Sequence, residues 1–183
     1  MSRTPPSPSS LRVADLNQSG KTGFALRPEK DRLTALAAEL GLSALRKLSF
    51  EGHVAPEGPA DWRLEGHLGA TVVQPCVVTL DPVTTRIETP VTRVFAKDYV
   101  EPDEPEAEMP EDDTIERLGP WIDPEAVMLE ALALNIPEYP RLPDAELGAL
   151  RVTEPGKAPL TDDDVKPFAG LAGLKEQLER KDD

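Results

Sequence analysis

Residues 61–73 read DWRLEGHLGATVV, and the pattern of this stretch decides the fold. Apolar and polar side chains alternate along it, which places the two kinds on opposite faces of an extended chain. This alternation is typical of a strand in an antiparallel sheet that has one face on the core and the other in water. The expected core-facing side chains are Trp62, Leu64, Leu68, Ala70 and Val72.

Similar patterns flank this strand on both sides. Residues 44–54 alternate in the same way, and so do residues 84–99, TTRIETPVTRVFAKDY. Pro90 in the second of these has no N–H to donate, so it indicates a sheet edge or a bulge. LRVADL, residues 11–16, is a candidate first strand, and the residues from 17 to 23 are turn-like.

Two helices are expected, one before these strands and one after them. Pro28 suits the first position of a helix, and Gly41 suits its end. Asp123 and Pro124 open the second helix as an N-cap acceptor and a first-turn proline, and Pro137 stops it.

The predicted fold class is α+β, an antiparallel β-sheet flanked by helices, either open or curled toward a barrel. Residues 1–10 are rich in Ser and Pro and are expected to be disordered. Residues 11–136 form a single α+β domain, which contains an extended acidic loop at residues 101–116. Residues 137–183 are an extended C-terminal tail that carries a short amphipathic segment at residues 166–180.

The net charge of −14 is unevenly distributed along the chain. Residues 1–53 carry eight basic and five acidic residues, whereas residues 101–183 carry eight and twenty-three. Nucleic-acid affinity comes largely from Lys and Arg that displace counterions, so the chain as a whole repels a phosphate backbone. The C-terminal half attracts basic partners instead, and no DNA partner is expected.

A small basic patch around the first expected helix is the exception. A solvated helix face is favoured over RNA binding here, because aromatic residues, at 4%, are too few to stack bases in the usual single-strand manner. The candidate RNA contacts are Arg27, Lys30, Arg32, Arg46 and Lys47.

The sequence shows no membrane or secretion signal. Its start, MSRTPPSPSSLRV, lacks the apolar region of a secretory signal peptide. No stretch approaches the roughly 18 apolar residues of a spanning helix. We expect a cytoplasmic protein with no membrane contact.

Cys76, in QPCVVTLDPV, is the single cysteine, and it is a metal ligand, a nucleophile or a buried thiol. Zinc sites use about four ligands and commonly begin with C-x2-C, but Thr79 holds the second position here. The other soft ligands, His53 and His67, lie on the polar faces of adjoining strands. A catalytic thiol needs a nearby base, which no sequence feature supplies. We therefore expect a small buried side chain, no metal, no cofactor and no catalysis.

Three stretches together resemble the YceD family, a bacterial and plastid family linked to accumulation of large-subunit ribosomal RNA. They are CVVTLDPV with the strand and acidic loop that follow it, IDPEAVMLEALALNIPEYP, and PFAGLAGLK. The similarity spans most of residues 20–175. The matching positions are Cys76, Ile122, Asp123, Leu132, Leu134, Pro137, Pro140, Pro167, Phe168, Ala169, Leu171, Leu174 and Lys175.

The resemblance implies a non-enzymatic role in ribosome biogenesis, in the synthesis, processing or accumulation of 23S rRNA. Together with the charge pattern, it suggests a basic ribosomal protein or assembly factor as partner, with precursor rRNA touching the weakly basic N-terminal part. A direct rRNA-binding protein is the alternative, and a metal-dependent enzyme is the least favoured reading. Family members with a second cysteine at the position of Thr79 could hold a metal, and some have another cysteine after the position of Pro140. This chain has neither.

Overall fold

The computed structural model describes residues 4–99 and 114–146, and the predicted α+β class is confirmed. The chain divides into two compact units, Met1–Pro143 and Asp144–Asp183, and the fold below is that of the first unit. In chain order its elements are β1 (Leu11–Arg12), the short 3₁₀ helix η1 (Val13–Asp15), β2 (Thr22–Leu26), α1 (Lys30–Glu39), β3 (Ala44–Glu57), β4 (Asp61–Pro75), β5 (Pro82–Ala96), β6 (Ile115–Arg117), β7 (Trp121–Ile122) and α2 (Pro124–Asn135).

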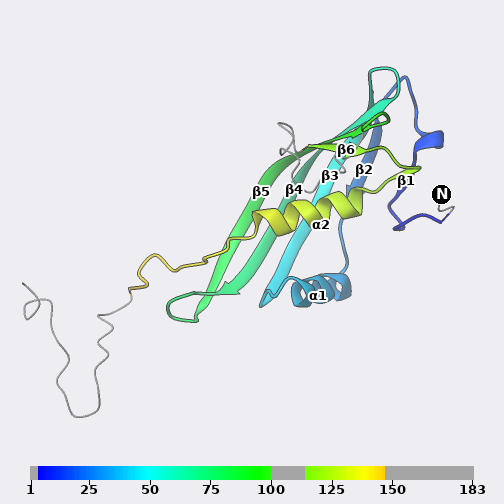
Figure 1. Cartoon of the computed structure of the whole chain (residues 1–183). Coiled ribbons are helices and arrows are strands. Elements are labelled where there is room, and N and C mark those ends of the chain that lie inside the picture. The colour runs from blue at the N-terminus through cyan, green and yellow to red at the C-terminus, as the bar shows by residue number, and fades with distance from the viewer. Residues whose placement is uncertain (1–3, 100–113, 147–183) are drawn as a thin grey trace, which may run out of the picture. The chain divides into compact units, whose positions relative to one another are not determined.

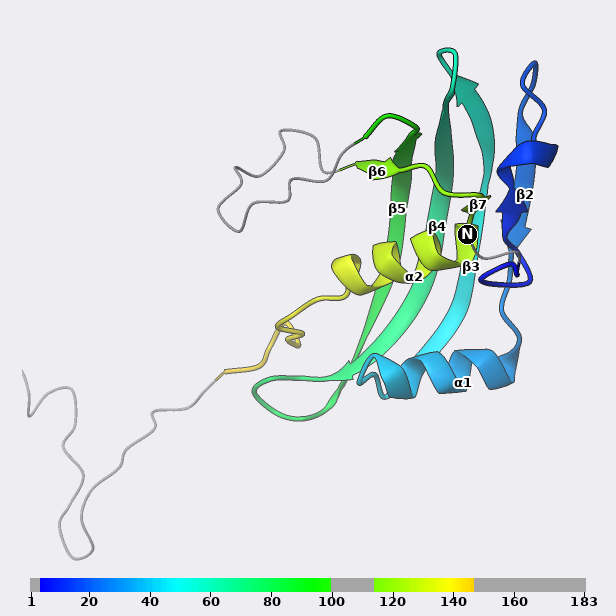
Figure 2. The same ribbon diagram turned by 45° about the vertical axis from the view of Figure 1, so that its right-hand side comes forward.

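The main sheet has the strand order β2-β3-β4-β5-β6, and β1 pairs with β7 in a separate two-stranded sheet. All neighbours are antiparallel except β5 and β6, which are parallel, so the sheet is mixed. The described strands form an open sheet and do not close into a barrel. Figures 1 and 2 show the long strands β3, β4 and β5 side by side, with α2 crossing one face of them and α1 near the start of β3.

The alternation in β4 is confirmed, because every expected core residue of residues 61–73 is buried. Phe50 pairs with Leu68, and Val54 pairs with Leu64, so the apolar face continues from β4 into β3. Buried residues of both helices join the same core cluster, which places α1 and α2 on this face.

The opposite face of the sheet is polar and carries histidine–glutamate contacts between neighbouring strands. His53 of β3 faces Glu65 of β4 with 3.4 Å between Nε2 and Oε2. His67 of β4 faces Glu88 of β5 at 2.8 Å, and Arg86 lies beside the same carboxylate. Arg86 and then His67 lower the pKa of Glu88. This face is therefore solvated, as the alternating pattern predicts.

The two helices reach the sheet through short apolar stretches. α1 begins at Lys30, two residues later than the proline at position 28 suggests, and buries Leu36 and Ala37. At the start of α2, Asp123 is the N-cap, as predicted, and its Oδ1 accepts the Glu125 N–H at 3.0 Å. Glu130 of this helix also pairs with an arginine of β5 at 2.7 Å.

The first strand of the main sheet differs from the expectation. Of residues 11–16, only Leu11–Arg12 is extended, and a 3₁₀ helix follows. β2 instead occupies Thr22–Leu26, in the segment interpreted as a turn and the approach to a helix. The Phe24 side chain of β2 packs on Phe50 of β3, with 5.0 Å between the ring centroids. Five residues with glycine and alanine on one face give too weak an alternation, and the long-range pairing with β3 decides the structure.

Pro90 lies in β5 opposite His67. On its other side, β6 pairs only with Val94–Ala96, so within the described residues Pro90 lies on an open stretch of sheet edge. The edge interpretation of this proline is confirmed, since this stretch of β5 has no strand on its other side among the described residues.

Several expectations fall outside the described residues. Most of the acidic loop, from 101 to 113, and the tail from 147 onward lie there, while Ile115–Arg117, at the end of that loop, forms β6. The domain boundaries therefore stay predictions. Within the N-terminal segment expected to be disordered, Ser7 Oγ donates to Asp123 Oδ1 at 2.7 Å.

Gly66 allows close packing in the centre of the sheet, and its replacement tests this packing. A Cβ there would lie 2.6 Å from Phe50 Cε2, and this ring is fully buried. We expect Gly66→Ala to lower the free energy of unfolding by about 1–3 kcal/mol, measured by urea denaturation. The control is Gly23→Ala in β2, where the nearest atom is 3.8 Å away. Equal effects of the two substitutions would contradict this account of the core.

Candidate functional site

Cys76 lies in the turn between β4 and β5, just after β4 ends at Pro75. Its N–H donates to Asp81 O at 2.7 Å, and its carbonyl accepts the Leu80 N–H at 3.0 Å. These bonds close the turn around the thiol, which is fully buried, so the expectation of a buried side chain is confirmed.

The segment that follows α2 is bonded to this turn. Val77 N–H donates to Pro140 O at 2.9 Å, and the side-chain amide of Gln74 donates to Pro137 O at 3.0 Å. We call the turn 76–81 together with residues 136–142 the Cys76 corner. Three predicted motif positions from distant parts of the sequence, Cys76, Pro137 and Pro140, meet in it.

The Cys76 corner stabilises the thiolate. Hydrogen bonding from the Thr79 hydroxyl is the main cause that lowers the pKa of Cys76 from 9.0 to about 7. The backbone N–H groups of Leu142, Thr79 and Val78 act in the same direction, and burial opposes them. The Val78 nitrogen lies 3.5 Å from the sulfur. Since the thiol is also closed off from solvent, a reagent reaches it only when the corner opens.

The residues at Cys76 do not fit a metal ion. The sulfur accepts hydrogen bonds from Thr79 and from backbone N–H groups, where a metal centre would need further ligands. Within residues 4–99 and 114–146, no three His, Cys, Asp or Glu side chains are grouped as metal ligands. His53 and His67 lie instead against glutamates of the polar sheet face.

The other described motif residues mainly position α2. Ile122 and Leu132 are fully buried, and Asp123 caps the helix. Leu134, by contrast, is 76% exposed. The remaining predicted positions lie outside the described residues, and their roles stay predictions; they are Pro167, Phe168, Ala169, Leu171, Leu174 and Lys175.

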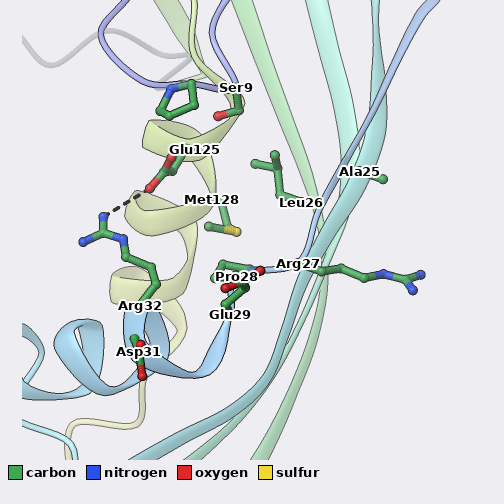
Figure 3. A pocket seen from close by; sticks show the side chains of 11 residues that line it. Ser9, Ala25, Leu26, Arg27, Pro28, Glu29, Asp31, Arg32, Glu125 and Met128 are labelled. Atoms are coloured by element: carbon green, nitrogen blue, oxygen red, sulfur yellow. Dashed lines mark hydrogen bonds and ion pairs between the residues drawn. The ribbon is translucent and has the colours of Figure 1, made fainter.

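The five candidate RNA contacts separate into two groups. Arg27 and Arg32 border a pocket of about 780 Å³ that also contains Met128 and Glu125. Figure 3 shows Arg32 bonded to Glu125, at 3.1 Å, while Arg27 points away from Met128. Arg27 pairs with Glu51 on the polar face of the sheet, and this contact raises its pKa. Both arginines thus have carboxylate partners.

The other three candidates line a separate cleft of about 330 Å³ between α1 and the start of β3. We call it the α1–β3 cleft. Its cationic side chains are Lys30, Arg46 and Lys47.

Sequence patterns do not reveal several residues of these sites. Thr79 stands in the sequence only where a second metal ligand is absent, whereas in the structure its hydroxyl bonds to the thiol. Gln74, whose amide bonds to the Pro137 carbonyl, could have been singled out in the sequence. It is a polar residue at an even-numbered position, where β4 otherwise places its apolar side chains. Leu142 and Ser7 act through contacts across long sequence separations, and no local pattern marks them.

Comparison with known families identifies the chain. The model of a family described as large ribosomal RNA subunit accumulation protein YceD matches residues 64–175, more than half of the sequence. The chain belongs to the YceD family. This membership confirms the resemblance and gives the chain a role in the accumulation of large-subunit ribosomal RNA; the description names no reaction. Searches of curated proteins and of solved structures found no match.

A search of the described residues for a helix long and apolar enough to cross a membrane found none.

We expect purified protein to contain no stoichiometric zinc. The physical reason is that Thr79, at the second ligand position, bonds to the sulfur as a hydrogen-bond donor. Elemental analysis of the full chain checks this. One metal ion per chain, lost on Cys76→Ser, would show the prediction to be wrong.

The lowered pKa of Cys76 predicts a pH dependence of stability. Because the folded pKa, about 7, is below the ordinary 9.0, the unfolded chain binds more protons at this site between these values. The contribution to stability is therefore complete above pH 9 and is lost as the pH falls through about 7. Urea unfolding of the wild type and of Cys76→Ala should differ increasingly as the pH rises through this range.

Thr79→Val removes the main cause of the shift and should reduce this pH dependence. Thr84→Val, at an exposed position in β5, is the matched control and should leave it unchanged. If the free energies of unfolding of the wild type and of Cys76→Ala differ by the same amount at every pH, the stabilised thiolate is refuted.

Proposed function

We propose that the protein is a non-enzymatic factor of ribosome biogenesis that supports accumulation of 23S rRNA by binding a basic ribosomal protein or assembly factor. Membership of the YceD family supplies the link to large-subunit rRNA. The distribution of charge supports the class of partner. The proposal also implies a location in the compartment where ribosomes are assembled.

The acidic excess lies in one part of the chain, and this observation carries the proposal. Residues 4–99, which include α1 and β1 to β5, contain eleven basic and eleven acidic residues. Residues 100–183 contain eight basic and twenty-three acidic residues. Their net charge of −15 is larger in magnitude than the −14 of the whole chain. A field of one sign raises the association rate of an oppositely charged partner. Ribosomal proteins are, as a class, partners of this kind, because they neutralise rRNA phosphates.

Exposed apolar side chains near the Cys76 corner support a protein partner. The largest among the described residues are Val77, Leu80, Leu134 and Tyr139, which are 53%, 77%, 76% and 79% exposed. Val77 is bonded to Pro140, next to Tyr139 in the chain, so at least these two lie in one region. Apolar anchors inside a charged surround are typical of protein interfaces.

Direct contact with precursor rRNA is a second candidate function. The observation that favours it is the convergence of three cations in the α1–β3 cleft.

The proposed partner class predicts the effect of removing acidic charge. The triple variant Glu104→Gln, Glu106→Gln and Glu108→Gln should capture less protein from an RNA-free extract of large-subunit ribosomal proteins. Exposed ion pairs contribute about 0.2–1 kcal/mol each, so we expect a severalfold loss, larger at low salt. Capture is measured by quantitative mass spectrometry of proteins bound to the full chain.

The control carries the same change in net charge at exposed positions of the sheet-and-helix body. It is Asp15→Asn, Glu39→Gln and Asp98→Asn, all exposed in the structure. Equal capture by the two triple variants and by the wild type would rule out the acidic half as the attracting surface.

A further inference from the structure

The α1–β3 cleft has a cationic lining without acidic side chains. One wall is a face of α1, in which Lys30, Leu33, Thr34 and Ala37 recur at helical spacing. The other wall is the chain from Ser43 to Lys47 as it enters β3. The polar side chains that line it are Lys30, Thr34, Ser43, Arg46 and Lys47.

The three cations have no carboxylate partner within the part of the chain that the structure describes. Other basic side chains do, since Arg27 pairs with Glu51 and Arg32 with Glu125. The lining of the cleft has three cationic and no acidic side chains, so positive charge is locally in excess there. Like charges that line one cavity repel each other, and a bound anion replaces this repulsion by electrostatic attraction.

A bulge in β3 positions two of these cations. The register shifts between Arg46 and Ser49, and Lys47 has a φ of 51°, in the left-handed region. Because of the bulge, Leu45 and Leu48 are both buried although they are three residues apart. Regular alternation would turn one residue of the intervening pair toward the core. The bulge therefore keeps both Arg46 and Lys47 exposed beside the cleft.

Contacts from the polar face of the sheet hold this bulge. Arg86 Nη1 donates to the Lys47 carbonyl at 3.4 Å and to Thr71 Oγ1 at 3.2 Å. Gly69 makes room for this arginine, since a Cβ there would lie 2.7 Å from Nη2. A left-handed backbone at a long side chain is unfavourable by itself and persists where its surroundings fix it. Arg86 is such a positioning residue for Lys47.

The cleft fits phosphate and offers nothing that reads a base. Lysine and arginine form charge-assisted hydrogen bonds with phosphate oxygens. Ser43 adds an exposed hydroxyl, whereas the Thr34 hydroxyl already donates to the Lys30 carbonyl at 3.0 Å. No aromatic residue is among the lining side chains, so bases have no stacking platform there. A nucleic acid in this cleft would therefore be bound through its backbone, independently of sequence.

We propose that the α1–β3 cleft is a binding site for the phosphate backbone of RNA, formed by Lys30, Arg46 and Lys47. The choice of RNA rests on the proposed function in rRNA accumulation. The cleft lies before residue 64, where the family match begins, so this site is inferred from the structure of this chain alone.

The test uses the full chain and a fluorescently labelled single-stranded RNA of mixed sequence, with binding measured by anisotropy over a range of salt concentrations. The cleft variant is Lys30→Gln, Arg46→Gln and Lys47→Asn, because asparagine tolerates the left-handed backbone. The control, Arg12→Gln, Lys21→Gln and Lys97→Gln, removes the same charge at exposed positions elsewhere.

The cleft variant should bind RNA at least tenfold more weakly than the control variant. Its slope of log affinity against log salt should fall by about 2, since each single-strand phosphate contact contributes about 0.7. Equal affinity of the two variants would overturn the proposal. If the cleft variant melts at a lower temperature than the control, Lys30→Gln alone decides: a severalfold loss supports the site, and unchanged binding overturns it.

Two further arms separate the alternatives. Inorganic phosphate that displaces RNA at concentrations matched for phosphate would show a small-anion site and overturn the assignment to RNA. Capture of ribosomal proteins by the cleft variant should equal that of the control variant, because the acidic half is unchanged. Loss of RNA binding and loss of protein capture are thus measured separately, and each proposal can fail alone.

Discussion

One-sided burial of the central strand is the constraint on which the rest of the structure depends. β4 places its even-numbered apolar side chains on a dry face, and both long neighbours must continue that face in register. A shift of one residue would expose the whole set to water. Glycines at positions 52 and 66 keep the two backbones and the Phe50 ring close enough for this packing. The opposite face is thereby left to polar and charged side chains, among them Arg86, which holds the bulge in β3.

Strands with strong alternation could be predicted from the sequence, and contacts across long separations could not. β3, β4, β5 and the cap of α2 follow from local patterns. β2 does not, because its pairing with β3 and its ring contact at Phe24 are formed only in the folded chain. The short parallel pairing of β6 is undetectable for the same reason.

The same division applies to the candidate sites. Cys76 follows β4 directly, and its main hydrogen bond comes from Thr79 within the same turn. The bond from the Leu142 N–H comes from a segment more than sixty residues later, which no local pattern indicates. The five basic residues near α1 form one group by sequence. Carboxylates at positions 51 and 125, which no spacing rule connects to them, neutralise two and leave three. Charge pattern thus located the region, and tertiary pairing decides which of its cations remain available to an anion.

The two proposed contacts lie near each other because of how β3 and β4 pair. The Ser43 N–H, in the wall of the α1–β3 cleft, donates to the Val73 carbonyl at 2.8 Å. Cys76 follows Val73 by three residues, a path of about 10 Å at the usual rise of a strand. The start of β3 and the end of β4 thus bring the phosphate site and the Cys76 corner to one end of the sheet. A protein on the exposed apolar side chains and an RNA strand in the cleft, as proposed above, would therefore both lie at this end of the sheet.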